Sequence, residues 1–279
     1  MRKFRKIAVV SWSVSLLFTT LLGTSCEMKL TPFADEGDAS RISIERYDLL
    51  ESRYLTTGDF SALQQMNTEY PMQTRMLIED MLQLGEVNDP DINNRLLNFY
   101  QDSLLQILIQ DTENHYANMA DINRNLDKSF RKLEKLLPGI ERPVVYTQIG
   151  ALNQSVLIGE RLIGISLDKY LGADYPLYQR YYEENQRQTM TRDYIVPDCM
   201  VFYVLSQYPL SRYDERSLQE RELHMAKVMW VANKSLGSSF FKRPYIDAVD
   251  EYLSDHKGLS VEELMEADDY DSLLKYVAE

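Results

Sequence analysis

The chain has 279 residues, of which 44% are hydrophobic and 26% charged, a balance typical of a folded globular protein. Asp and Glu number 43 against 30 Lys and Arg, which gives a formal net charge of −13. Such a surface repels phosphate backbones, and no compact run of Lys or Arg follows the first residues. We therefore expect no local basic stripe and no nucleic-acid partner.

The first 25 residues have the features of an export signal. Residues 1–6 are basic, and the apolar stretch 7–22 falls short of the roughly 20 residues of a membrane-spanning helix. Residues 21–26, Leu-Leu-Gly-Thr-Ser-Cys, resemble a lipobox of the looser kind found in Bacteroidetes, with Leu22 one place further from the cysteine than usual. We expect cleavage after Ser25 and a diacylglycerol and palmitate anchor on Cys26. The alternative is a secreted protein with an incidental cysteine.

Cleavage would leave a more acidic chain with one free thiol. The leader contains four of the 30 basic residues and no acid, so 26 remain against 43, a net charge of −17. Residues 26–41 are polar, which predicts a flexible tether, and 42–279 form one globular domain. With Cys26 acylated, Cys199 has no partner, so we expect no intramolecular disulfide and a buried, inert thiol.

Apolar residues three and four apart predict four or five helices between residues 44 and 137. Pro71 opens a helix that Gly85 ends, and the pair at 89–90 opens the next. A long amphipathic stretch follows at 101–137, with a break near Asn114. The first half of the domain is therefore expected to be helical.

Three short β-branched runs follow, at residues 144–149, 155–158 and 162–167. The pair at 159–160, Gly-Glu, suits a hairpin turn between the last two runs. We expect a small antiparallel sheet with helices before and after it.

The remainder is expected to be helical again. A helix is predicted around 197–207, and Ser217 with Glu220 forms a capping box for a helix that ends before Gly237. Pro244 opens a helix that ends near residue 258, and a second capping box starts at residue 260. The fold class is therefore α+β and predominantly α-helical.

The search for catalytic chemistry finds no standard motif. The chain has three histidines, and none has a second histidine at helical spacing, so a zinc hydrolase helix is excluded. No Gly-x-Ser-x-Gly turn is present, and the glycines are too scattered for a phosphate-binding loop. We expect no catalytic residue, no metal and no cofactor.

The densest feature is a tyrosine cluster after the third β-branched run. Five tyrosines lie within 13 residues. They provide rings that can stack on a glycan or contact a partner protein. Alternatively, they pack this segment onto the sheet and leave their hydroxyl groups at its rim. The cluster consists of Tyr170, Tyr175, Tyr178, Tyr181 and Tyr182.

The same segment resembles the central signature of the gliding-motility lipoprotein GldB family of Bacteroidetes. The resemblance extends over residues 143–207 in order, spacing and residue type, and it includes 167–172, 175–178 and 195–198. A helix at 223–231 resembles a second family motif, with Ala226 where that motif has glycine. The signal and its cysteine fit the same family. The resemblance implies a lipid-anchored protein that supports motility and its secretion machinery.

The family is in turn distantly similar to zincin proteases, which have a His-Glu-x-x-His helix after a pair of strands. In this chain the corresponding helix, 197–205, has no histidine and one acid. If that ancestry holds, the metal site is lost and a zincin-like scaffold remains.

Ten residues within or beside the signature are the candidate interaction site. Local ion pairs and helix caps would explain the charged members equally well, with Thr191 capping one helix start and the pair at 197–198 opening another. The candidates are Asp168, Lys169, Tyr170, Gly172, Tyr175, Pro176, Tyr178, Arg192, Pro197 and Asp198.

Three hypotheses for function follow. The leading one is a non-catalytic, lipid-anchored envelope protein of the GldB type that contacts other envelope proteins, including motility or secretion components. We expect it at the outer rather than the inner membrane, and on the periplasmic rather than the external face. The alternatives are a zincin-derived hydrolase with an unrecognised site and a surface glycan-binding lipoprotein.

Overall fold

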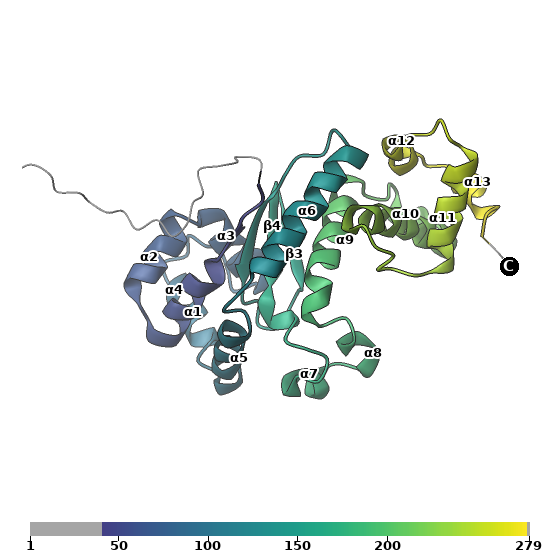
Figure 1. Ribbon diagram of the computed structural model, residues 1–279. Helices are drawn as coiled ribbons and strands as arrows, with labels where there is room; N and C mark the ends of the chain where they lie inside the picture. The colour runs from purple at the N-terminus through teal and green to yellow at the C-terminus, as the bar shows by residue number, and fades with distance from the viewer. Residues whose placement is uncertain (1–40, 278–279) are drawn as a thin grey trace, which may run out of the picture. The chain divides into compact units, whose positions relative to one another are not determined.

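The computed structural model describes residues 41–277 (Figure 1). The predicted signal peptide at 1–25, the lipid site at Cys26 and nearly all of the tether at 26–41 lie outside the described residues. The described chain is packed almost from its start, because Ile42 is only 5% exposed and belongs to the hydrophobic core.

The first half consists of a short strand, six α-helices and one π-helical turn among the described residues. Gly58 has a left-handed φ of 70° and ends the first helix, so residues 47–68 form two helices. The predicted helix from Pro71 continues as a π-helical turn at Met76–Met81. The elements are β1 (Ile44–Glu45), α1 (Tyr47–Thr57), α2 (Phe60–Thr68), α3 (Pro71–Arg75), α4 (Ile92–Phe99), α5 (Ser103–His115) and α6 (Ala120–Leu136).

The three predicted β-runs form β2 (Val144–Gln148), β3 (Val156–Gly159) and β4 (Leu162–Ser166). The sheet has the order β1-β2-β4-β3, and only the β3–β4 pair is antiparallel. The prediction of an antiparallel sheet was therefore wrong, and the sheet is mixed. β4 takes the central place beside β2 because it is almost wholly buried, whereas β3 is partly exposed and lies at the edge.

Two further details of the strands differ from prediction. Residues 44–45 were expected in a helix, but they form β1, which pairs in parallel with β2 about a hundred residues away. The hairpin turn lies at Glu160 and Arg161, one residue later than predicted, and Arg161 has a left-handed φ of 58°. Both differences depend on strand pairing, which local sequence patterns do not specify.

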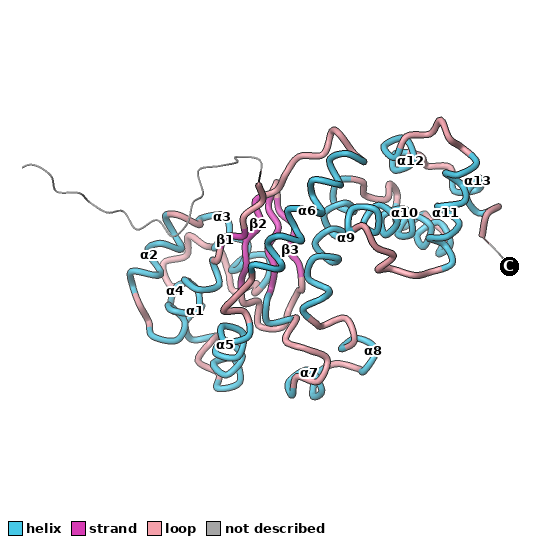
Figure 2. Tube along the Cα trace, in the orientation of Figure 1, coloured by secondary structure: helices cyan, strands magenta, loops and turns pink. Residues whose placement is uncertain are grey.

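Helices cover both faces of the sheet (Figure 2). Successive side chains of β2 point to opposite faces of the sheet, and a hydrophobic cluster lies on each face. Val145 belongs to one cluster and Tyr146 to the other. Helices α1, α2, α4 and α5 and the π-helical turn contribute to the cluster around Tyr146, and α6 with the second-half helices contributes to the cluster around Val145.

The second half is helical, and both predicted capping boxes are present. Gly237 ends the long helix with a left-handed φ of 72°. No helix in the described part of the chain is long and apolar enough to span a membrane. The elements are α7 (Pro176–Tyr181), α8 (Glu184–Arg187), α9 (Ile195–Gln207), α10 (Leu218–Leu236), α11 (Pro244–Asp255), α12 (Val261–Glu266) and α13 (Tyr270–Leu274). The prediction of a predominantly helical α+β fold is confirmed.

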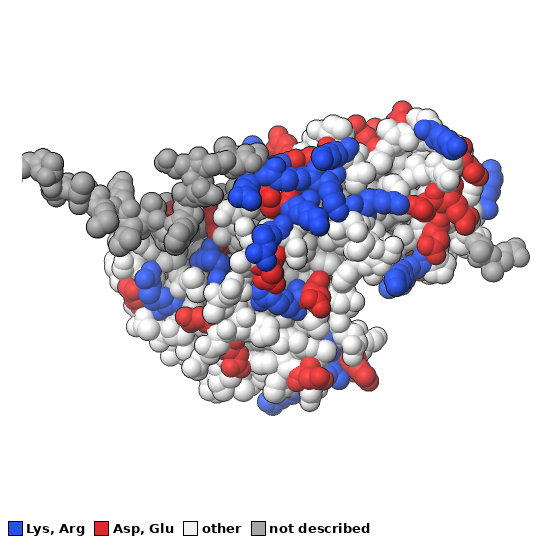
Figure 3. Space-filling model, viewed as in Figure 1, with Lys and Arg blue, Asp and Glu red and all other residues white. Residues whose placement is uncertain are grey.

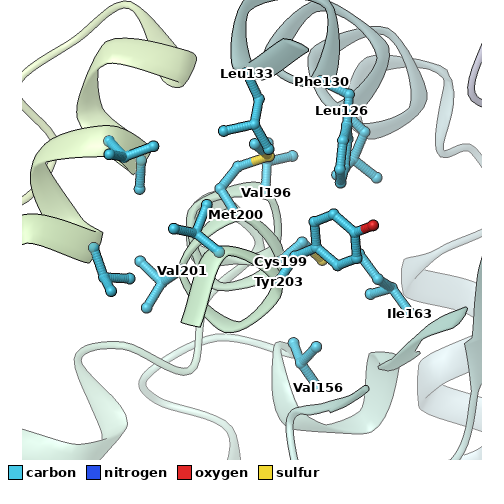
Figure 4. Packing of buried hydrophobic residues seen from close by; sticks show 14 of the residues in the cluster. Leu126, Phe130, Leu133, Val156, Ile163, Val196, Cys199, Met200, Val201 and Tyr203 are labelled. Carbon is cyan, nitrogen blue, oxygen red and sulfur yellow. The ribbon is translucent and has the colours of Figure 1, made fainter. Parts of the chain in front are cut away.

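The helix α9 occupies the centre of the larger core. Its side chains pack between α6 and the sheet (Figure 4), and the rings of Phe130 and Tyr203 lie 5.4 Å apart at a steep angle. Cys199 is buried and free, as predicted, and burial raises the pKa of its thiol. Most of α9 is buried, which explains why this segment is apolar and has no polar face.

Candidate functional site

The signature segment folds around the loop that follows β2. In this loop Ala151 and Leu152 both have left-handed backbone angles, with φ of 50° and 62°. Asp168, two residues after the end of β4, is fully buried and accepts the backbone N–H groups of Gly150 at 2.8 Å and Leu152 at 2.6 Å. Burial raises the pKa of Asp168, and the two N–H donors oppose that rise. Asp168 therefore holds the loop in a strained conformation.

A second buried carboxyl group, which the sequence analysis missed, approaches the same loop from α1. Glu51 accepts the backbone N–H of Ile149 at 2.8 Å, and Tyr100 donates its hydroxyl to the Ile149 carbonyl oxygen at 2.5 Å. Burial raises the pKa of Glu51 well above its usual range, and nearby Asp168 adds to the rise. No local motif marks Glu51, because it lies 98 residues from its partner.

The tyrosines of the cluster are mostly packed inside. Tyr178 is buried, donates its hydroxyl to the carbonyl oxygen of Asp168 and accepts the backbone N–H of Leu171 at 3.0 Å. Tyr175 packs edge-on against Tyr178 and donates to a carboxylate oxygen of Asp111 at 2.9 Å.

Of the other three tyrosines of the cluster, two form hydrogen bonds within the fold and one is exposed. Tyr170 is buried, and its carbonyl oxygen accepts the hydroxyl of Tyr116 at 2.6 Å. Tyr182 donates its hydroxyl to the Leu152 carbonyl oxygen at 2.7 Å, whereas Tyr181 is 56% exposed. The rings interlock and do not form one flat stacking surface.

Lys169 closes the loop from its outer side. Its ammonium group donates to the Leu152 carbonyl oxygen at 3.3 Å and to the Tyr182 hydroxyl at 3.0 Å. The same nitrogen lies 4.4 Å from the centre of the Tyr182 ring, within the range of a cation–π contact. Lys169 thus contacts the same loop residue as Asp168.

Gly172 and Pro176 shape the turn between the sheet and α7. Gly172 has a φ of 116°, which an L side chain rarely adopts, and its N–H donates to the Met190 carbonyl oxygen at 3.0 Å. Pro176 is the first residue of α7. A backbone N–H at this position has no partner within the helix, so a proline here costs no hydrogen bond. Both residues have a backbone role.

Asp198 is connected to this cluster through one hydrogen bond. The hydroxyl of Tyr170 donates to its carboxylate at 2.8 Å. Burial raises the pKa of Asp198 to about 6, although the Tyr170 hydrogen bond opposes the rise. Asp198 lies in the first turn of α9, which begins at Ile195, two residues before the predicted start.

Arg192 and Pro197 line a hollow of about 270 Å³ next to α6. The guanidinium of Arg192 donates to both carboxylate oxygens of Asp121, at 2.6 and 3.1 Å, and to the Asn118 carbonyl oxygen at 2.8 Å. This is the local ion pair expected as the alternative role. Thr191 makes no side-chain cap, so that part of the expectation was wrong.

An apolar groove that the sequence analysis missed lies between α10 and α11. It has a volume of about 410 Å³. Its lining includes Leu218, which is 71% exposed, with Tyr213, Met225, Met229 and Tyr245. Leu218 directly follows Ser217, the N-cap of α10. An apolar residue at this exposed position is the feature of the sequence that could have indicated the groove.

The expectation of no basic stripe was wrong. Figure 3 shows Lys and Arg gathered over α6. Their spacing of three or four residues puts them on one helical face, although they never form a compact run in the sequence. They are Arg124, Lys128, Arg131, Lys132 and Lys135.

No group of three or more His, Cys, Asp or Glu side chains within residues 41–277 is arranged to hold a metal ion. The structure brings Asp168, Lys169, Tyr170 and Tyr178 together around the loop after β2. Arg192 reaches this group through Tyr116, because its guanidinium lies 5.1 Å from the centre of the Tyr116 ring.

The fold and this cluster define an α+β protein in which a tyrosine-rich segment closes the loop at the end of a mixed sheet. The family model described as gliding motility protein GldB matches residues 33–239, and the chain belongs to this family. The match includes the signature and α10 and leaves out α11 to α13. Comparisons with curated proteins and with solved structures give no match.

Proposed function

We propose that this chain is a lipid-anchored protein of the cell envelope, attached through Cys26, which acts without catalysis by binding other envelope proteins. Its membership of the GldB family supports a role in gliding motility or the associated secretion machinery. Its location is the outer membrane, on the periplasmic face.

The hydrogen bonds of the signature segment are the main support for a non-catalytic role. The carboxylate of Asp168 and the hydroxyl of Tyr178 are buried and bonded to the chain's own backbone. A general acid, base or nucleophile must instead reach a substrate atom. The carboxyl group of Asp198 likewise has Tyr170 as its partner. The signature therefore serves to shape the domain.

The groove between α10 and α11 is the surface that we propose for protein contact. Its lining is mostly apolar, although it includes Arg221, Glu222 and Arg243, and exposed apolar patches on soluble domains commonly mark interaction sites. Met225 and Met229 are part of this lining, and methionine side chains adapt easily to a partner's shape.

Crosslinking and affinity purification from native envelopes test this proposal. We expect the wild-type chain to recover motility or secretion components and Leu218→Asp to lose them. Phe60→Asp, at a 74% exposed position on α2, is the matched control and should recover the same proteins as the wild type. Recovery of sugar-uptake components instead would support the glycan-binding alternative and contradict the proposal.

Two further measurements test the anchor and the absence of catalysis. Mass spectrometry of the natural protein should find acyl groups on Cys26, and Cys26→Ala should be released from membranes that are washed with high salt; a bare thiol in the natural protein would contradict the anchor. A peptide-cleaving activity that Asp198→Asn abolishes would show that the chain is an enzyme.

A further inference from the structure

Helix α6 has two opposite faces. Ile122, Leu126, Phe130 and Leu133 are buried and attach one face to the core. At 100° per residue, the basic positions of the stripe centre on the opposite side of the helix and point away from the core. An acidic protein therefore has a basic surface along its most amphipathic helix, which Figure 3 shows.

The acids of this helix pair with only one residue of the stripe. Asp127 binds Arg131, whereas Asp121 binds Arg192 and Glu134 binds Arg142, which lie outside the stripe. In contrast, Arg124, Lys128 and Lys135 are exposed and have no carboxylate partner among residues 41–277. These three side chains are available to an external anion.

The start of the described chain is fastened to the same helix. The backbone N–H of Ile42 donates to the Asp127 carboxylate at 3.0 Å, and that of Ile44 donates to the Asn123 side chain at 2.8 Å. The intervening residues 27–41 span at most roughly 50 Å when fully extended, at about 3.5 Å per residue. A lipid on Cys26 would therefore keep α6 within this distance of the membrane surface.

We propose that the outward face of α6 docks onto the anionic phospholipid headgroups of the membrane that holds the Cys26 lipid. This inference rests on the proposed anchor for the choice of a lipid surface and of the membrane. A basic patch can add to a lipid anchor, because each cation near an anionic surface adds to the attraction. The attachment of the chain to α6 favours a lipid surface over an acidic protein, since the anchor brings that helix to lipid.

Co-sedimentation with vesicles tests the proposal, using the mature chain from residue 26 with Cys26→Ser, which has no lipid of its own. We expect binding to vesicles that contain phosphatidylglycerol, little binding to pure phosphatidylcholine, and loss of binding at high salt. The triple variant Arg124→Gln, Lys128→Gln, Lys135→Gln should bind the anionic vesicles on the order of 100-fold more weakly.

The matched control replaces three exposed basic residues elsewhere, as Arg53→Gln, Arg180→Gln, Lys257→Gln. It has the same net charge as the test variant and should retain nearly all binding. Circular dichroism of both variants checks that they fold.

Equal binding to both kinds of vesicle, or equal losses in the two triple variants, would overturn the proposal. Binding to soluble polyglutamate without binding to vesicles would assign the face to an acidic protein and would also overturn it. Because this chain has no lipid, the result is independent of acylation at Cys26, which mass spectrometry tests separately.

Discussion

The carboxylate of Asp168 accepts the backbone N–H of Gly150 at 2.8 Å and thereby connects the end of β4 to the loop after β2. A β-carbon at Gly150 would lie only 2.8 Å from the hydroxyl oxygen of Ser166, so the backbone approaches β4 more closely than a side chain allows. The two residues form the centre of the signature segment.

Replacing Asp168 by Asn should destabilise the domain. The amide offers one acceptor oxygen where two N–H groups need acceptors, and its NH2 group would face the other donor. We expect a loss of about 2–3 kcal/mol in the free energy of unfolding, measured by urea denaturation. Asp174→Asn, at an exposed position in the same segment, should change stability by less than about 0.5 kcal/mol. Equal effects of the two substitutions would disprove the bridging role.

Asp198 should make the stability depend on pH in a defined direction. Its pKa is about 6 in the folded chain against 3.8 for the ordinary group, so the folded state binds the proton more tightly. The resulting contribution of Asp198 to the free energy of unfolding is complete below pH 3.8 and is lost as the pH rises through 6. The total loss is about 3 kcal/mol.

The variant Asp198→Asn removes this titration and can still accept the Tyr170 hydroxyl. Relative to wild type, it should gain about 2–3 kcal/mol between pH 4 and pH 7, measured as the difference in unfolding free energy at each pH. Asp193→Asn, one turn earlier and exposed, is the control. A pH-independent difference between Asp198→Asn and wild type would contradict the raised pKa of Asp198.

Two tyrosines of the cluster should differ sharply in their effect on stability. Tyr178→Phe loses a buried hydroxyl that bridges the Asp168 carbonyl oxygen and the Leu171 N–H, at a cost of about 1–3 kcal/mol. Tyr181→Phe removes an exposed hydroxyl and should cost less than about 0.5 kcal/mol. Thermal unfolding measures both, and the reverse order would mean that the packing described here is wrong.

His224 should remain neutral down to about pH 4. Burial lowers its pKa to about 4, and the charge of Lys227 adds to the effect. The Tyr208 carbonyl oxygen, 2.9 Å from Nε2, requires the ring hydrogen on that nitrogen, so Nδ1 accepts from the Tyr270 hydroxyl.

Ring nitrogen shifts in NMR spectra measure the charge and the tautomer of His224 directly. Because its pKa falls on folding, the stability that it contributes is complete above pH 6.5 and is lost as the pH falls through 4. The urea-unfolded chain is the control and should titrate near 6.5. Titration of the folded chain at that same value would contradict the burial of this ring.

The local pattern of the sequence determined most of the helices and the position of each long strand. Capping boxes and helix-ending glycines act within three or four residues, so Ser217 with Glu220 predicts the start of α10, and Gly237 predicts its end, without knowledge of the rest of the chain. The signature residues were also recognisable, since their order and spacing lie within one segment.

Only the tertiary structure decided what those elements pair with. The parallel pairing of β1 and β2, the contact of Glu51 with Ile149 and the site where the chain joins α6 all link residues about 80 to 100 positions apart. Such contacts depend on which faces of the helices and of the sheet are buried together and on the register of the strands. Both are properties of the packed chain and not of a local segment. The packed core likewise buries one side of α6, so the lysines and arginines spaced along this helix lie together on its opposite, exposed side.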